Sequence, residues 1–242
     1  MKYALLLLPL TSLLSAGRAQ AQHHYEFSAR LSGNAFNFRG SGAPAEAQMV
    51  GVFAAAGQAY TNNRYGRGTG LGGGVGLRAQ RVAESGFLVG AELGFERVQS
   101  RIDVTSVVLM RGDFINPDLY AVPATGNTHF NSGFATAYLG LGQRLRLGQG
   151  LVLDLLAGAE LGLKVDANER GHATTTTTGQ TFTTALPDYG WRPLDKRLRA
   201  EAALWRGRAG LQASYSHGLQ TYYTDATTYS RTYRLGVAYR LR

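Results

Sequence analysis

The sequence predicts an all-β protein: an eight-stranded antiparallel up-and-down transmembrane β-barrel with short periplasmic turns and four long external loops. Two observations predict it. From Tyr25 onward, hydrophobic residues recur at every second position, which is the period of a β-strand. The stretches with this period are joined by connections that alternate strictly between short and long, and outer-membrane barrels show this asymmetry.

The composition is that of a folded, exported chain. Of the 242 residues, 44% are hydrophobic and 17% are charged, so the chain is no disordered polyelectrolyte. Cysteine is absent, which excludes disulfide scaffolds, thiolate metal sites and cysteine nucleophiles. The net charge of +9 suits anionic lipid or arginines inside a pore. Export disfavours nucleic acid, so we expect no nucleic-acid partner.

The first 21 residues have the three parts of a secretory signal peptide. Lys2 supplies the positive start, Ala4–Leu14 is apolar, and Ala19-Gln20-Ala21 has the small residues of a cleavage site. The apolar run covers about half of the roughly 20 residues that a membrane-spanning helix needs. We expect cleavage after Ala21 and a barrel domain over residues 22–242.

The first four predicted strands each oppose an apolar face with polar residues or glycine. In the first strand, glutamate and arginine oppose the apolar residues. In the second strand, glycines and Arg78 oppose them, and in the third strand two glutamates do so. The fourth carries Phe134 and Tyr138 on its polar face, beside threonine and glycine. The four strands are predicted over Tyr25–Ser32, Leu71–Gln80, Phe87–Glu96 and Ala135–Gly142.

The last four predicted strands repeat the pattern, most clearly at the end of the chain. There Tyr233, Leu235 and Val237 alternate with Arg234 and Gly236. Most of the eight stretches suit the roughly 9–11 residues that a tilted strand needs to cross a bilayer. These four strands are predicted over Leu151–Lys164, Arg197–Leu204, Arg208–Ser216 and Arg231–Leu241.

The connections predict which end of the barrel faces outward. Tight glycine-containing hairpins are expected at 83–86, 148–150 and 206–207. Long loops are expected at about Arg39–Gly70, Asp103–Ser132, Asp166–Leu194 and Gly218–Thr228. Loops of this length are uncommon in a compact domain unless they serve a function.

Alternation alone does not decide which face meets water. A soluble lipocalin-like barrel would bury the apolar face, whereas a membrane barrel would turn it to lipid and fill the lumen with charges. Glycines that make room, charges of both signs and aromatic residues near strand ends favour the membrane barrel. The expected lumen network is structural, with glutamates paired to arginines as a plug. Its members are Arg78, Glu92, Glu96, Arg144, Asp154, Glu160, Lys164, Arg199, Glu201 and Arg234.

Two segments resemble strands of a known family. Residues 229–241 (YSRTYRLGVAYRL) look like the final strand, and residues 86–96 (GFLVGAELGFE) like the third strand, of small outer-membrane β-barrel proteins of the Bacteroidota, OmpA/OmpX-like type. The resemblance implies insertion by the barrel-assembly machinery, which often recognises a terminal aromatic residue. This chain departs from that pattern, since it ends in Arg242.

Three short motifs carry no chemistry that we would assign. The glycines of 68–73 match a dinucleotide pattern, but an alternating strand follows them where a helix is needed. Arg111-Gly112-Asp113 lies in a long loop, where a turn explains it. His23-His24 lacks further metal ligands.

The remaining histidines are the candidates for catalysis. His129, His172 and His217 lie near loops or strand ends, and Glu169 and Asp225 are carboxylates nearby in sequence. They could form an acid–base pair at the external rim, as in a membrane hydrolase or acyltransferase. No supported constellation is visible, so we interpret them as solvated histidines and predict no catalytic, cofactor or metal site.

The sequence therefore predicts an outer-membrane barrel, not an enzyme, with a structural or surface-interaction role. A narrow pore, a rim hydrolase or acyltransferase, and an exported soluble binding barrel remain alternatives. The expected partners are outer-membrane lipid and lipopolysaccharide, the barrel-assembly machinery during insertion, and an unknown extracellular ligand of the loops.

Overall fold

A computed structural model describes residues 24–53, 58–111, 118–187, 194–222 and 226–241. Within these ranges the chain forms eleven strands, and no helix is long and apolar enough to cross a membrane. The predicted signal peptide, the mature N-terminus and the Arg-Gly-Asp motif lie outside the described residues, apart from the backbone of Arg111.

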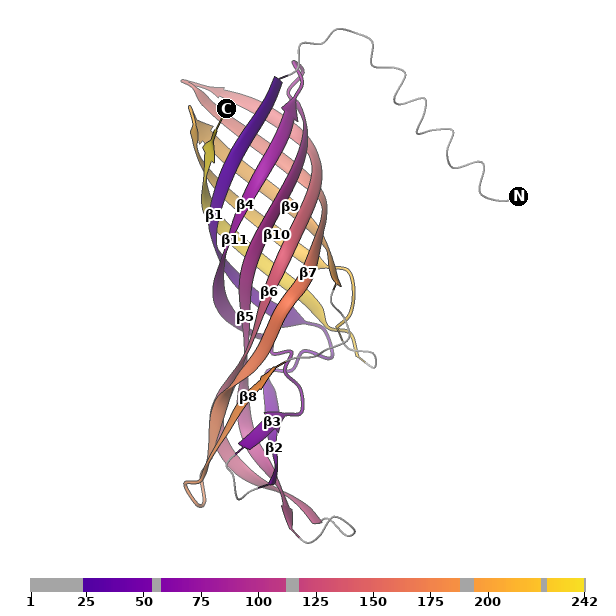
Figure 1. Ribbon diagram of the computed structural model, residues 1–242, viewed down its shortest axis with the longest axis vertical. Helices are drawn as coiled ribbons and strands as arrows, with labels where there is room; N and C mark the ends of the chain where they lie inside the picture. Colours follow the sequence, from indigo (N-terminus) through magenta and orange to yellow (C-terminus); the bar gives the residue numbers. More distant parts are fainter. Residues whose placement is uncertain (1–23, 54–57, 112–117, 188–193, 223–225, 242) are drawn as a thin grey trace, which may run out of the picture.

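Eight of the strands close into a large barrel (Figure 1). Neighbouring strands are antiparallel throughout, and pairing of β1 with β11 and of β7 with β9 closes the ring. In order around the ring, the strands are β1 (His24–Arg39), β4 (Gly68–Val82), β5 (Phe87–Arg111), β6 (Asp118–Gly148), β7 (Leu151–Thr175), β9 (Leu194–Arg206), β10 (Ala209–Gly218) and β11 (Tyr229–Arg240).

The eight-stranded prediction is confirmed, and the three tight hairpins lie at one end of this barrel. Gly86, Gly148 and Gly207 adopt positive φ angles of 82°, 86° and 59° in these turns, a conformation that glycine adopts without steric cost. The chain termini of the described part lie at the same end (Figure 1). We call it the turn end and the opposite one the loop end.

Two of the four predicted loops were wrongly predicted, because these segments form strands. Asp103–Ser132 and Asp166–Leu194 mostly continue the strands β5, β6 and β7 beyond the large barrel. β5 and β6 stay paired in the antiparallel direction as far as Arg111↔Asp118. The pairing has one irregularity, between Val104 and Ser106. These strands therefore carry the sheet well past the large barrel.

The strand extensions close a second, small barrel at the loop end (Figure 1). Three short strands complete it: β2 (Glu46–Phe53), β3 (Gln58–Thr61) and β8 (Thr181–Pro187). The ring runs β2-β3-β8-β7-β6-β5 and returns to β2. It includes two parallel pairings, β2 with β5 and β3 with β8.

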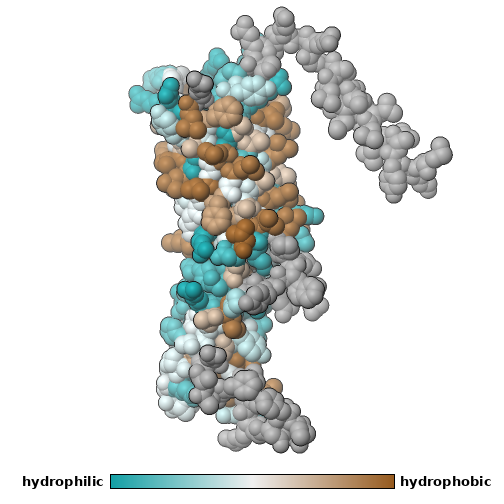
Figure 2. All heavy atoms as spheres, viewed as in Figure 1, coloured by the Kyte–Doolittle hydropathy of each residue, from teal (hydrophilic) through white to brown (hydrophobic). Residues whose placement is uncertain are grey.

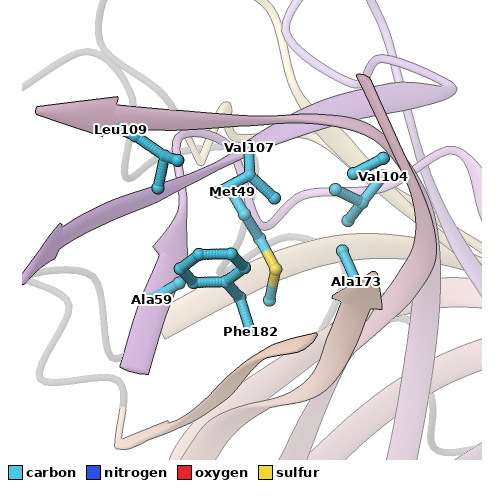
Figure 3. Close-up of a cluster of buried hydrophobic side chains, with 8 residues drawn as sticks. Met49, Ala59, Val104, Val107, Leu109, Ala173 and Phe182 are labelled. Carbon is cyan, nitrogen blue, oxygen red and sulfur yellow. The ribbon is translucent and has the colours of Figure 1, made fainter. Parts of the chain in front are cut away.

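The small barrel has a conventional hydrophobic core. Met49 and Phe182 lie side by side at its centre (Figure 3) and are fully buried. Val104, Val107 and Leu109 of β5 face them, and the core is completed by Ala59, Ala124 and Ala173. This barrel is therefore apolar inside, like a water-soluble protein.

The large barrel has the opposite polarity. Its outward side chains are hydrophobic, as the band of brown residues around it shows (Figure 2), and Leu93 and Leu235 are 69% and 70% exposed. Its inward side chains are charged or polar, and Arg234 and Glu160 are buried in the lumen. One continuous sheet thus changes from apolar outside to apolar inside along its length.

An aromatic cluster separates the two interiors. Phe38 lies at its centre, with ring centroids 5.0 Å from Phe36, 5.1 Å from Tyr65 and 5.1 Å from Tyr222. Phe130 packs on the same group. Because aromatic rings at these distances leave little open space between them, the cluster closes the loop end of the large barrel.

Candidate functional site

The lumen of the large barrel contains a first cluster of ion pairs among five side chains from β1, β4, β5 and β9. Arg78 contacts Glu92 at 2.8 Å, and Arg199 contacts Glu201 at 2.6 Å. Arg30 binds both carboxylates. All five are at least nine-tenths buried, so each buried charge has a partner, as burial requires.

A second cluster continues toward the loop end. Arg234 contacts Glu96 at 2.8 Å and Glu160 at 2.9 Å. Arg197 reaches the same two glutamates and also binds Asp195 at 2.6 Å. Arg199 of the first cluster contacts Glu160 at 3.0 Å, so the two clusters form one network.

A third group lies near the turn end. Arg144 holds Glu26 through two hydrogen bonds of 2.7 Å and Asp154 through two of 2.7 and 2.8 Å. Arg240 adds a contact of 3.3 Å to Glu26 and stacks 4.2 Å from the ring of Trp205. This end of the lumen is therefore also filled by paired charges.

Phe134 and Tyr138 point into the lumen and support the arginines. Arg197 lies 4.9 Å from the centroid of Phe134, and Arg199 lies 4.7 Å from that of Tyr138. A desolvated guanidinium over an aromatic face is attracted by the ring. The aromatic residues on the polar face of the fourth predicted strand are thus part of the charged interior.

The charges of these groups balance. Seven arginines, Arg30, Arg78, Arg144, Arg197, Arg199, Arg234 and Arg240, meet seven carboxylates, Glu26, Glu92, Glu96, Asp154, Glu160, Asp195 and Glu201. A cavity of about 30 Å³ lies between Glu92, Glu160 and Arg199, room for about one water molecule. The arrangement can hold the barrel shut, and the excess positive charge of the chain lies outside it.

The ten predicted lumen residues differ in how deeply the structure buries them. Eight are buried in the lumen, and the Arg144 side chain is nearly so. Lys164 is half-buried near the loop end. Arg144 pairs with Glu26 and Asp154 instead of the four glutamates expected for it.

Sequence reasoning omitted five members from the predicted network: Glu26, Arg30, Asp195, Arg197 and Arg240. Four of them, Glu26, Arg30, Arg197 and Arg240, lie on the polar faces of predicted strands, so alternation alone could have included them. Asp195 falls just outside the predicted strand.

The outer face of the small barrel carries a second arrangement, a polar ladder across β5, β6 and β7. The register aligns three rows of side chains, and every position is polar. Within it, Gln99 donates to Asn131 at 2.9 Å, and Asn131 donates to Asn168 at 3.4 Å. The rows are Gln99–Asn131–Asn168, Arg101–His129–Arg170 and Asp103–Asn127–His172.

The middle row of the ladder is basic. His129 lies between Arg101 and Arg170 in the register, and burial, then the Arg101 charge, lower the pKa of its imidazole. Arg101 contacts Asp103 at 2.8 Å. No carboxylate of the described residues lies within ion-pair distance of Arg170.

The structure does not bring the histidines together with the carboxylates named beside them. Glu169 points into the small barrel, where it accepts a hydrogen bond of 3.2 Å from the Thr61 amide, whereas His172 is exposed on the outer face. His217 lies on the wall of the large barrel, next to Tyr215, and Asp225 is outside the described residues. Within the described residues, no group of acidic residues and histidines is placed to hold a metal ion.

Comparisons with known proteins give only distant structural matches. No family model and no curated protein matches the sequence. Ail of Yersinia pestis, solved with the heparin analogue sucrose octasulfate, matches with a TM-score of 0.35 and 14% identity over 90% of this chain and 99% of its own. Neisserial surface protein A matches with a TM-score of 0.35 and 10% identity over 88% and 96%. The translocator domain of autotransporter NalP from Neisseria meningitidis matches with a TM-score of 0.23 and 13% identity over 98% and 95%.

Ail and Neisserial surface protein A are small outer-membrane β-barrel proteins. At these identities and TM-scores, the likeness says nothing about the ligand or activity of this chain. Its own strand pairing and polarity carry the functional argument.

Proposed function

We propose that this chain is an outer-membrane protein in which the large barrel is a closed anchor and the small barrel is a contact module outside the cell. The observation that supports this proposal is the reversal of polarity along one sheet. Leu93 of β5 is 69% exposed on the large barrel, whereas Val107 of the same strand is fully buried in the small one. Such a change suits strands that pass from lipid into water.

The hydrophobic wall of the large barrel supports a membrane location. Leu31, Leu71, Leu77, Leu139 and Leu211 are all more than half exposed. Monomeric soluble proteins rarely expose contiguous apolar patches beyond a few hundred Å². A soluble binding barrel would require the reverse orientation in this part of the chain.

The lumen supports an anchor instead of a pore. Opening a path along the axis would separate paired charges such as Arg199 and Glu201 in a desolvated interior, at a cost of several kcal/mol per exposed partner. The aromatic cluster closes the loop end as well. Eight strands leave an interior that side chains can fill completely.

The membrane location is tested by fractionation with heat-modifiability. We expect the full chain in the outer-membrane fraction, and folded protein to migrate differently in detergent gels before and after boiling. A detergent-free soluble fraction with unchanged migration would refute the proposal. Cysteine placed at exposed Ala185 of β8 should react with a membrane-impermeant maleimide on intact cells, whereas cysteine at Ser85 in a turn should not.

The polar ladder is the contact face that we propose on the small barrel. Its basic middle row, in which Arg170 has no carboxylate partner among the described residues, favours a carbohydrate that carries anionic groups. The neighbouring amides of Gln99 and Asn168 can bind sugar hydroxyls.

The ligand class is tested with immobilised sulfated and carboxylated polysaccharides. We expect Arg170→Gln to weaken retention about tenfold or more, since a charge-assisted hydrogen bond contributes about 1.5 kcal/mol or more. Arg208→Gln, exposed in the turn between β9 and β10 at the turn end, is the charge-matched control outside the ladder. Equal retention of wild type and Arg170→Gln would exclude the ladder as the contact face.

A further inference from the structure

The loop-end rim of the large barrel has an ion pair on one side and a group of basic residues on the other. On the β5–β7 side, Arg97 pairs with Asp166 at 2.8 Å, with both side chains exposed. On the opposite side, four basic residues project outward: Arg39, Lys196, His217 and Arg231. We call them the rim basic cluster.

The members of the rim basic cluster are neighbours in the sheet register. Arg231 pairs with His217 of β10 and with Asn37 of β1, and Arg39 follows two residues later on β1. Lys196 joins them across β9, where its carbonyl accepts the Leu219 amide at 2.7 Å. Four potential cations therefore occupy adjacent positions on four strands.

These cations lack counter-ions within the described part of the chain. No carboxylate there lies within ion-pair distance of Arg39, Lys196 or Arg231. The Nε atoms of Arg39 and Arg231 are buried and have no hydrogen-bond acceptor. A buried donor without an acceptor is unfavourable, so an external anion would stabilise it.

Aromatic side chains flank the cluster on the same outward face. The Tyr215 hydroxyl lies 3.3 Å from Nδ1 of His217, the ring of Tyr229 lies 5.9 Å from that of His217, and the ring of Tyr233 lies 5.0 Å from that of Tyr215. Tyrosines gather where a membrane surface meets water. In the proposed membrane location, these tyrosines would place the cluster at the height of the lipid headgroups.

A shallow apolar groove of about 1240 Å³ lies below the tyrosines and extends around the wall, lined by residues of β6, β7, β9, β10, β11, β1 and β4. The register places Ala200 opposite Tyr215, and Ala202 opposite Ala213. Tyr233 and Leu235 of β11 line it beside β10. The part of the groove along β9, β10 and β11 lies next to the rim basic cluster.

We propose that the β9–β10–β11 wall binds one phosphorylated glycolipid of the outer leaflet, with its phosphate on the rim basic cluster and its acyl chains in the groove. This inference rests on the proposed membrane location. Charge complementarity selects the occupant, because uncompensated guanidinium groups match phosphate and the apolar groove below them matches acyl chains. Being beside the small barrel, the site faces the external leaflet.

The test uses the full chain in phosphatidylcholine vesicles that contain a trace of bis-phosphorylated lipid A, with lipid retention counted by native mass spectrometry. We expect one retained lipid A for wild type. Arg39→Gln combined with Arg231→Gln should lower retention about a hundredfold, since two charge-assisted contacts are lost. Arg97→Gln, at the same height on the paired side, should retain lipid A like wild type.

A second pair of variants tests the groove without altering charge. Ala213→Leu should reduce lipid A retention, and Ala91→Leu, which also faces outward but lies on β5, should not. Ala213→Leu also decides the question if the double arginine variant fails to insert.

Two further measurements replace lipid A with lipid A that lacks its phosphates, or with inorganic phosphate alone. The inference would be overturned if wild type retained dephosphorylated lipid A as well as lipid A, or if Arg97→Gln lost as much retention as the double arginine variant. It would also be overturned if inorganic phosphate protected the barrel as well as lipid A does. Heat-modifiability in vesicles without lipid A is measured separately. Its absence would refute the membrane location itself and not the lipid site alone.

Discussion

Individual charged residues in the lumen act as members of a network, because each is shared by several partners. Glu201 binds Arg30, Arg78 and Arg199, so its loss would leave three guanidinium groups with reduced compensation. Exposed pairs differ: Arg97 and Asp166 are 62% and 42% exposed, and water screens their attraction. The same type of ion pair should therefore have very different effects on stability at the two locations.

Neutralising Glu201 should destabilise the large barrel strongly. We expect Glu201→Gln to lower the free energy of unfolding by about 3–5 kcal/mol, the range found when one partner of a buried pair is removed. Urea unfolding of vesicle-inserted protein measures it. Asp166→Asn is the exposed counterpart, with an expected change of about 0–1 kcal/mol. Equal changes in the two variants would mean that the lumen is hydrated and not a desolvated plug.

At the scale of elements, alternation predicted the large barrel well and the small barrel not at all. Val104 and Val107 differ by an odd number of positions, yet both face the same core, because the register shifts between Val104 and Ser106. A period-two pattern is lost at such an irregularity. Pairing of β2 with β5 and of β3 with β8 joins distant segments, and nothing in a single sequence indicates it. Within the lumen, alternation shows which residues face inward but not which partner each one chooses, as Arg144 illustrates.

The small barrel should lose its structure without disturbing the large one. Phe182→Ala removes a fully buried ring beside Met49, at a cost of about 3–5 kcal/mol. We expect protease to cleave the β7–β8 region of this variant on intact cells, while the heat-modifiable migration of the large barrel stays unchanged. Ala185→Ser, exposed on the same strand, is the control and should resist the protease. Loss of heat-modifiability in Phe182→Ala would show that the two barrels fold as one cooperative unit.

At the scale of the whole molecule, the two barrels divide the physical requirements of a surface protein between them. The large barrel turns leucines such as Leu235 outward and neutralises its own interior. The small barrel buries Met49 and Phe182 and presents amides, arginines and histidines to water. Because β5, β6 and β7 run through both barrels, continuous strands would join the proposed contact face to the proposed anchor.

The same division predicts that the molecule does not conduct ions. Any axial path must pass the paired arginines and glutamates and then the rings around Phe38. We expect no stepwise current when purified wild-type protein is added to planar bilayers under conditions in which insertion is verified by heat-modifiability. Phe38→Ala should not open a path, because the ion pairs beneath it remain. Neutralising Glu92 or Arg234 should act chiefly on stability, for the reason given for Glu201. Discrete wild-type openings that change with Glu92→Gln or Arg234→Gln would instead identify the lumen as a narrow pore, and the anchor proposal would have to be abandoned.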